Sequence, residues 1–149
     1  VLDGHEIVYV LRVPHRKIMS VALGIGSRLP AHCTSMGRIL LASLDDEHAL
    51  RLIKAAKPKA LTQRTLTDPQ AILDKVRQAR KAGWCLVNQE LEEGLISVAA
   101  PLVNRSGRTV AALNISGQAN RTNAKTMQEQ MLPALLSAAQ SISHLLQRQ

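Results

Sequence analysis

The hydrophobic pattern of this 149-residue chain changes its period three times. Strand-like residues near the amino terminus precede apolar residues at helical spacing up to Gly83, which give way to three strand-like runs at 84–89, 96–103 and 109–116. Helical spacing returns over 123–146. Strands and helices that occupy separate stretches predict an α+β domain, with a mostly antiparallel sheet and helices packed on its faces.

Short connections indicate how the strands pair. The turn-forming residues 104–107 predict that the last two strands are antiparallel neighbours. Near the amino terminus we expect a strand over 5–13, a hairpin connection, and a partner strand over 17–23. A loop over 24–32 then leads to the first helix. The predicted order is β-β-α-α-α-β-β-β-α in one domain covering residues 1–149.

Capping and breaking residues bound the other helices. A second helix is predicted from 46 to about 56, and Thr67 can cap a third over 68–82. The last helix spans 123–146, and Pro133 should kink it or mark its true start. No helical run approaches the roughly 20 apolar residues that span a bilayer, so no membrane contact is expected.

The start of the first helix is the strongest candidate binding feature. Pro30 cannot continue a helix from upstream, and Thr34 or Ser35 can cap the helix that follows. Backbone N–H groups without partners therefore gather from Thr34 to Gly37, where the helix dipole also favours a small anion such as a carboxylate. An ordinary capped helix that binds nothing is the alternative.

A second polar feature lies on the last predicted strand. Asn114 and Ser116 are two residues apart, so both should point to the same face of the sheet, and Ala112 leaves space beside them. Opposite a helix start, this pair would make a pocket for a carboxylate or a hydroxyl. A core polar pair that satisfies itself is the alternative.

The net charge of +8 raises the question of nucleic acid. Residues 51–81 hold nine basic and two acidic residues, so a basic domain that itself binds nucleic acid is one alternative function. Helical charges of this kind are usually solvated, and no zinc-finger, KH or RRM pattern accompanies them. Trp84 and Tyr9 are the only aromatic residues, which argues against a base-stacking platform. We expect weak or no specific binding of duplex DNA.

Cysteine and histidine usage bounds the remaining chemistry. Cys33 and Cys85 form neither a disulfide framework nor a CxxC pair, which favours a reducing cytoplasm. The histidines show no metal-ligand spacing, so no metal or cofactor is expected. An enzyme with a reactive Cys33 beside His32 is the remaining alternative, because a helix start can lower a thiol pKa.

Three segments together resemble a known family. They are GSRLPAHCTSMGRILLA at 26–42, GWCLVNQELEEGLISVAAP at 83–101 and GRTVAALNISG at 107–117. The chain resembles the C-terminal effector-binding domain of the IclR family of bacterial transcriptional regulators, which has a GAF-like fold. The resemblance implies a ligand sensor whose DNA-binding winged helix-turn-helix lies upstream. The start at Val1, without an initiator Met, agrees with that expectation.

The resemblance also implies a site between the sheet and the first helix. Backbone contacts would fall on Ser35 and Met36, and Leu95 would form an apolar wall. The full set of expected effector-binding residues is Thr34, Ser35, Met36, Asn88, Leu95, Ser97, Asn114 and Ser116. Asn88 departs from the family, since many relatives carry Asp in this region. Arg28, Arg38 and His32 are candidate charge partners for a bound acid.

The sequences of segments 26–42 and 90–95 are similar to those of one branch of the family, which regulates the breakdown of aromatic acids through protocatechuate and β-ketoadipate. This similarity implies an aromatic or dicarboxylic acid as effector and no enzymatic activity. It also implies a homodimer or tetramer that contacts DNA through the upstream domain and not through this chain. Effector binding would act allosterically on that contact.

Overall fold

The computed structural model describes residues 1–13 and 23–148, and its strands form two separate sheets. Both sheets are antiparallel and three-stranded. The small sheet contains β1 (Leu2–Asp3), β2 (Glu6–Val8) and β3 (Arg28–Pro30). The main sheet contains β4 (Cys85–Asn88), β5 (Leu95–Val103) and β6 (Thr109–Gln118), in that order.

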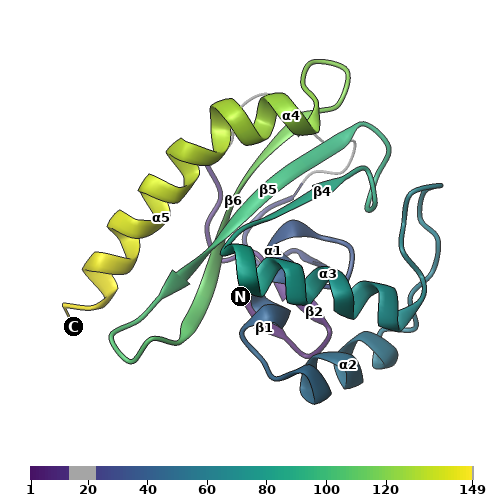
Figure 1. Ribbon diagram of the computed structural model, residues 1–149, viewed down its shortest axis with the longest axis horizontal. Helices are drawn as coiled ribbons and strands as arrows, with labels where there is room; N and C mark the ends of the chain where they lie inside the picture. The colour runs from purple at the N-terminus through teal and green to yellow at the C-terminus, as the bar shows by residue number, and fades with distance from the viewer. Residues whose placement is uncertain (14–22, 149) are drawn as a thin grey trace.

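The helices lie on both faces of the main sheet (Figure 1). One face carries α1 (Ser35–Ala42), which also contacts the small sheet and is flanked by α2 (Asp46–Ala55) and α3 (Pro69–Ala82). The other face is covered by the C-terminal helical run, which consists of α4 (Ala124–Thr126), the π-helical segment η1 (Met127–Met131) and α5 (Leu132–Leu146). The α+β class is therefore confirmed, with α1 between two sheets.

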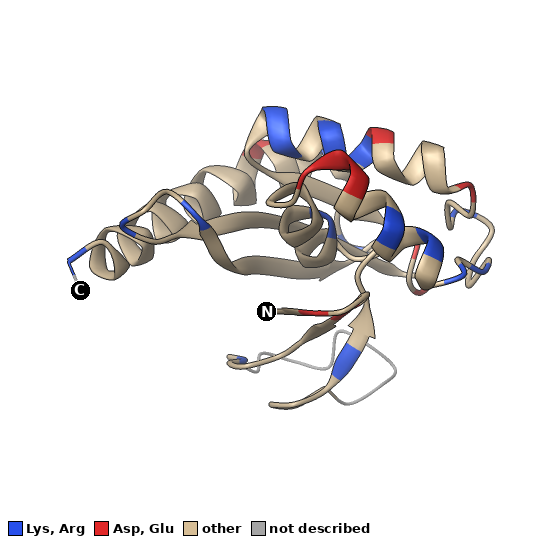
Figure 2. Ribbon diagram, turned by 90° about the horizontal axis from the view of Figure 1, so that it is seen from below, with Lys and Arg blue, Asp and Glu red and all other residues tan. Residues whose placement is uncertain are grey.

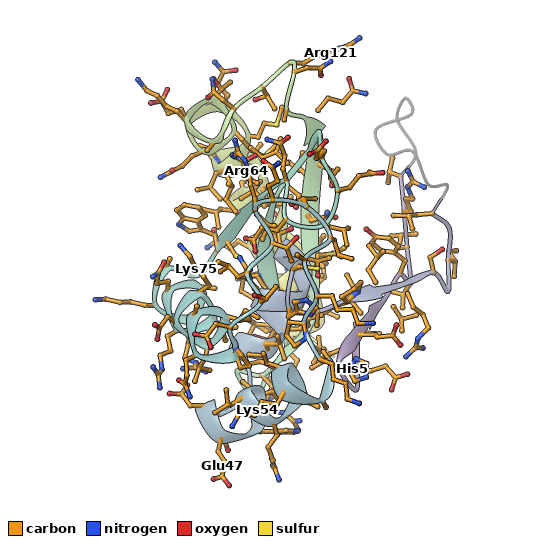
Figure 3. The ribbon with its side chains drawn as sticks, turned by 90° about the vertical axis from the view of Figure 1, so that its right-hand side faces the viewer. His5, Glu47, Lys54, Arg64, Lys75 and Arg121 are labelled. Carbon is orange, nitrogen blue, oxygen red and sulfur yellow. The ribbon has the colours of Figure 1, made fainter. Side chains whose placement is uncertain are left out.

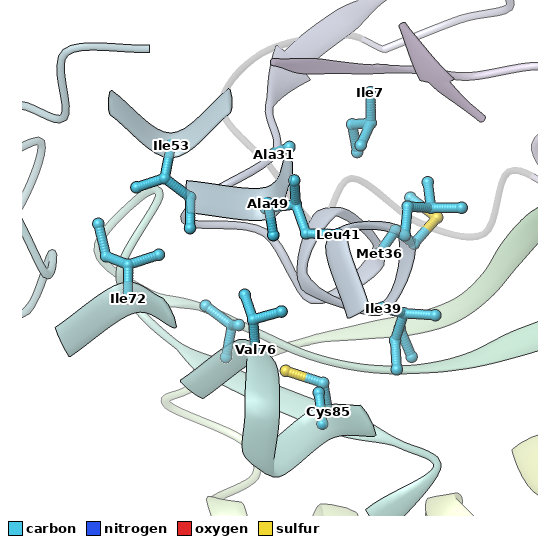
Figure 4. Packing of buried hydrophobic residues seen from close by; sticks show 14 of the residues in the cluster. Ile7, Ala31, Met36, Ile39, Leu41, Ala49, Ile53, Ile72, Val76 and Cys85 are labelled. Atoms are coloured by element: carbon cyan, nitrogen blue, oxygen red, sulfur yellow. The ribbon is translucent and has the colours of Figure 1, made fainter. Parts of the chain in front are cut away.

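Strand alternation divides the core in two. On β5, Ala99 packs in a cluster with α1, α2 and α3, whereas Ile96, Val98 and Ala100 pack in a second cluster against α5. Figure 4 shows the first cluster, to which α1 contributes Leu41, α2 contributes Ile53 and α3 contributes Val76. The middle strand β5 is buried on both faces from Leu95 to Ala100. That double burial holds the two layers of helices on one sheet.

The amino-terminal strands differ from their prediction. The expected strand over 5–13 is confined to Glu6–Val8. The expected hairpin and partner strand fall on 14–22, outside the described residues, and Leu23 is not in a strand. Instead, β2 pairs with β1 and with β3, so the predicted loop over 24–32 contains a strand. The predictions of a nine-residue strand and of a loop over 24–32 were wrong because strands this short leave too little periodicity to detect. Pro30 is tolerated because β3 is an edge strand.

The helix boundaries agree more closely with prediction. The cap of α3 is Asp68 and not Thr67, because its carboxylate accepts a hydrogen bond from the Ala71 amide at 3.2 Å and Pro69 follows as the first helical residue. Gly83 ends α3 in the left-handed conformation, with φ of 79°. Pro133 lies in the first turn of α5, directly after the π-helical segment. Among the described residues, no helix is long and apolar enough to cross a membrane.

Candidate effector-binding site

The start of α1 is fixed by its cap and by a close backbone approach. The Thr34 hydroxyl accepts from the Gly37 amide at 3.2 Å and donates to the Pro30 carbonyl at 2.9 Å. Gly37 lies so close to the preceding segment that an added Cβ would be 2.1 Å from the Ala31 carbonyl oxygen. The cap prediction at Thr34 is confirmed, and the amide of Ser35 lies in the first turn, where N–H groups have no partner within the helix.

The main sheet presents polar side chains to this helix start. Ser97 on β5 is paired with Ser116 on β6, and Asn114 lies two residues before Ser116 on the same face. The Ser35 and Ser97 hydroxyls share a hydrogen bond of 2.8 Å, which joins α1 to the sheet. The Asn114 side-chain amide donates to the Ser116 hydroxyl at 3.1 Å. Hydroxyl and amide groups from α1, β5 and β6 therefore lie close together between the helix start and the sheet.

A small cavity lies between these groups, and we call it the effector cavity. Its volume is about 20 Å³, which is room for about one water molecule. Its walls are Tyr9, Leu29, Cys33, Thr34, Ser35, Met36, Val87, Leu91, Leu95, Ser97, Asn114 and Ser116. A larger cavity of about 380 Å³ adjoins it and shares the walls Tyr9, Met36, Asn114 and Ser116.

Seven of the eight expected site residues line the effector cavity, and Asn88 does not. Strand alternation explains the difference. Val87 lies opposite Ser97 and faces the cavity, whereas Asn88 lies opposite Ile96, which packs on the α5 side. The side chain of Asn88 accepts a hydrogen bond from Gln89 instead.

Five wall residues were missed from the sequence: Tyr9, Leu29, Cys33, Val87 and Leu91. Alternation along the predicted strand over 84–89 could have found Val87, because it shares a face with Cys85. Tyr9 and Leu29 belong to the small sheet region, whose pairing gives no signal in the sequence. Burial raises the pKa of Tyr9, so its hydroxyl stays protonated at neutral pH and can donate a hydrogen bond.

Arg38, a candidate charge partner, lies outside the cavity in a buried ion pair. Its guanidinium donates to both Glu90 carboxylate oxygens, at 2.8 and 2.6 Å, and its Nε donates to the His32 carbonyl at 2.9 Å. The Arg38 and Glu90 side chains are only 2% and 11% exposed. This pair ties α1 to the loop between β4 and β5, which contributes Leu91 to the cavity.

The two other candidate charge partners are also absent from the effector cavity. Arg28 is exposed and forms ion pairs with Asp3 and Glu6, at 2.8 and 3.0 Å. The His32 ring is buried among other residues, and burial together with the Arg38 charge lowers its pKa. Recognition of an acid in this cavity would therefore depend on hydroxyl, amide and helix-start donors.

The geometry around Cys33 argues against the alternative of an enzyme that uses this cysteine as a nucleophile. Cys33 is fully buried, and burial raises its pKa to about 12. The thiol is therefore protonated at neutral pH, and the neighbouring His32 ring makes no hydrogen bond to it within the described structure. A nucleophile needs a lowered pKa or an adjacent base.

The basic stretch over 51–81 is partly neutralised within the chain (Figure 2). Arg77 pairs with Asp46 and Asp74, at 2.8 and 3.2 Å. Arg80 pairs with Asp46 at 2.7 Å and donates to the backbone carbonyls of Ala42, at the end of α1, and of Leu44. These arginines link α3 to α2, so their role is structural. In the described part of the chain, no cluster of three or more His, Cys, Asp or Glu could hold a metal ion.

The fold and the cavity together define a class of α+β domain with a small polar space between a helix start and a sheet face. Residues 1–144 match the family model of the bacterial transcriptional regulator IclR C-terminal domain, and the chain belongs to this family. The resemblance found in the sequence is thereby confirmed. The chain spans about half the length of the curated relatives it matches.

Two curated relatives that match nearly the whole chain are named as regulators. The chain is 44% identical over 144 residues to the Pca regulon regulatory protein of Pseudomonas putida, covering 96% of this chain and 50% of that protein. It is 39% identical over 150 residues to the p-hydroxybenzoate hydroxylase transcriptional activator of Acinetobacter baylyi, covering 97% and 55%. Both relatives are named as regulators, in agreement with the transcriptional-regulator family to which the chain belongs.

One similar solved structure contains a bound acid. It is a double mutant of the PobR inducer-binding domain from Acinetobacter in complex with 3-hydroxybenzoic acid. This chain is 37% identical to it, with a TM-score of 0.86, and the match covers 97% of this chain and 85% of that one.

Proposed function

We propose that this domain binds a small organic acid, aromatic or dicarboxylic, in the effector cavity and thereby modulates DNA binding by another part of the protein. The observation that carries this proposal is the meeting of the α1 start with Ser97, Asn114 and Ser116 around one cavity. Amide and hydroxyl donors of this kind suit a carboxylate. The 3-hydroxybenzoic acid bound by the PobR domain supports an aromatic acid of similar size.

An acid of that size needs more room than about 20 Å³. The adjoining space of about 380 Å³ is the natural source, since Tyr9 and Met36 line both cavities. We propose that the carboxylate binds among the polar groups and that the rest of the acid displaces these two side chains. The protonated Tyr9 hydroxyl would then be a further donor to the acid.

Calorimetric titration with 4-hydroxybenzoate, protocatechuate and β-ketoadipate tests the proposal. Asn114→Ala removes a hydrogen-bond donor to a charged ligand, which is worth about 1.5 to 3 kcal/mol, so affinity should fall about tenfold or more. Asn88→Ala is the matched control, because Asn88 lies on the opposite face of the sheet. Equal losses in both variants, or no binding of any of the three acids, would refute the site.

The regulatory step requires more than this domain. We propose a homodimer or tetramer in which acid binding changes the spacing of paired DNA-binding domains. Two operator half-sites require two DNA-binding domains, one for each half-site. A coupling of roughly 1 to 3 kcal/mol would change operator affinity about 5- to 150-fold. Anisotropy measurements on the full-length regulator, with and without the acid, would measure this coupling.

A further inference from the structure

A second cavity lies between the small sheet and the C-terminal end of α2, and we call it the α2 cavity. Its volume is about 240 Å³, and it shares no wall residue with the effector cavity. Side chains of one short segment alternate between the two cavities. Leu29 and Cys33 line the effector cavity, whereas Pro30 and His32 line the α2 cavity. Figure 3 shows His5, another wall residue, at the end of the molecule where α2 carries Lys54.

The walls of the α2 cavity carry a surplus of positive charge. Lys57 and Lys59 follow the end of α2 and both line the cavity. The acidic wall residue, Glu6, is already paired with Arg28 at 3.0 Å. Two carbonyls of the last turn of α2, those of Leu52 and Lys54, accept hydrogen bonds of 3.1 Å from the amides of Ala56 and Lys57. An anion in this space would therefore meet two lysines and one carboxylate, Glu6, whose charge is partly offset by Arg28.

His32 provides an independent indication of a ligand. Its side chain is 95% buried, and neither ring nitrogen has a hydrogen-bond partner in the described part of the chain. Nearly all buried polar groups are paired, so two orphaned nitrogens on one ring require an explanation. A neutral imidazole offers one donor and one acceptor. Both nitrogens are covered by protein atoms, so the ring must turn about its side-chain torsions to present a nitrogen to the cavity.

Apolar groups complete the walls and indicate the rest of the ligand. Pro30 and Ala56 form part of the lining, and Leu61 lies at its edge with 52% of its surface exposed. A short aliphatic chain would cover Leu61 while a charged end reached the lysines. We propose that the α2 cavity is a second binding site, for a small aliphatic carboxylate, whose carboxylate contacts Lys57, Lys59 and His32.

Heteronuclear NMR titration of the chain with hexanoate tests this site, with uncharged hexanamide as the ligand control. We expect saturable shifts at the Lys57 and Lys59 amides and at the His32 ring nitrogens. Hexanamide should leave these signals in place. The double variant Lys57→Gln with Lys59→Gln should bind hexanoate at least about tenfold more weakly, because it removes both cations.

Two further variants separate this site from non-specific charge and from the effector cavity. Lys75→Gln with Lys81→Gln makes the same change of net charge on the exposed face of α3 and should leave hexanoate affinity unchanged. Asn114→Ala should also leave it unchanged, even though it weakens binding in the effector cavity. Hexanoate shifts confined to the effector cavity, an absence of saturable shifts, or equal losses in the two lysine variants would overturn the proposal.

Discussion

The two sheets of this domain differ in length, burial and sequence separation. The main sheet has strands of four, nine and ten residues that follow one another along the chain, and helices cover both of its faces. The small sheet has strands of two, three and three residues, and its third strand is remote from the first two. A strand buried on both faces is stabilised by its own apolar side chains, whereas the small sheet depends on what it packs against.

This difference matters because the effector cavity takes walls from both sheets. Ser97, Asn114 and Ser116 come from the main sheet, while Tyr9 and Leu29 come from the small sheet region. Helix α1 contacts both sheets and is the element that joins them. A ligand could therefore move the small sheet side of the cavity at lower free-energy cost than the main sheet side.

The largest expected effect is on the free energy of unfolding, and it compares the buried Arg38–Glu90 ion pair with the exposed ion pairs of Arg28. Arg38→Met leaves the Glu90 carboxylate buried without its partner, so the free energy of unfolding should fall by about 3 to 5 kcal/mol. Arg28→Met on the small sheet removes exposed ion pairs and should cost less than about 1 kcal/mol. Urea unfolding of both variants measures the contrast. Similar losses would show that the two arginines do not differ as their burial implies.

A second substitution tests the close packing of α1 against the segment that leads from the small sheet. Gly37→Ala would place a methyl group against the Ala31 backbone, which cannot give way as a flexible side chain could. We expect a loss of about 1 to 3 kcal/mol in the free energy of unfolding. Gly24→Ala is the control, since no atom lies within 4 Å of an added Cβ there. If thermal unfolding midpoints fell equally in both variants, close packing at Gly37 would not be the cause.

A smaller effect measures the hydrogen bond that joins α1 to the main sheet. A double-mutant cycle with Ser35→Ala and Ser97→Ala should give a coupling energy of about 0.5 to 1.5 kcal/mol, because the hydroxyls share a bond of 2.8 Å. The same cycle with Ser35→Ala and Ser143→Ala should give almost none. Ser143 lies on α5, where it accepts from the Val103 amide across the opposite face of the sheet. A coupling of equal size in both cycles would contradict a direct contact.

The smallest effect concerns pH and the buried His32 ring. Its pKa is lowered by burial and then by the Arg38 charge, so the unfolded chain binds this proton more readily than the folded one. The contribution of the neutral His32 ring to the free energy of unfolding is therefore fully present above the ordinary histidine pKa of 6.5. That contribution declines as the pH falls below this value. Relative to His32→Phe, the original chain should lose stability on acidification from pH 7.5 to 5.5.

Exposed His48 supplies the control for the pH measurement. Its side chain is exposed at the start of α2, and only its backbone amide contributes to the cap through Asp45. Urea unfolding at several pH values should therefore show no such difference between His48→Gln and the original chain. A pH dependence that survives in His32→Phe would assign the proton uptake to another group.

Much of the fold and most of the candidate site could be predicted from local signals. The caps at Thr34 and Asp45, the left-handed Gly83 and the turn over 104–107 each act within a few residues, so their effects are visible in the sequence. The face shared by Asn114 and Ser116 follows from strand period alone. Binding at the expected residues stays a prediction, including that of Asn88, whose position on the far face argues against it.

Two further failures share one cause, which is contact between segments remote in sequence. Pairing of β2 with β3 depends on which segments of the chain meet in the folded structure. Strands of three residues are too short to show a period that predicts this pairing. The partner of Arg38 could not be foreseen either, because Glu90 lies 52 residues away along the chain. A charge on a helix looks the same in sequence whether it is solvated or buried in an ion pair.

By itself, the sequence determined the helices and the strands of the main sheet, their order, the family, and the polar groups at the helix start and on the main sheet. These depend on short-range sterics, hydrogen bonding and periodicity, which act between near neighbours. Only the tertiary structure decided that α1 lies between two sheets, that the arginines form ion pairs away from the cavity, and that Tyr9 and Met36 line both adjoining spaces. Those features arise from packing between distant segments, where burial and geometry decide which side chains meet.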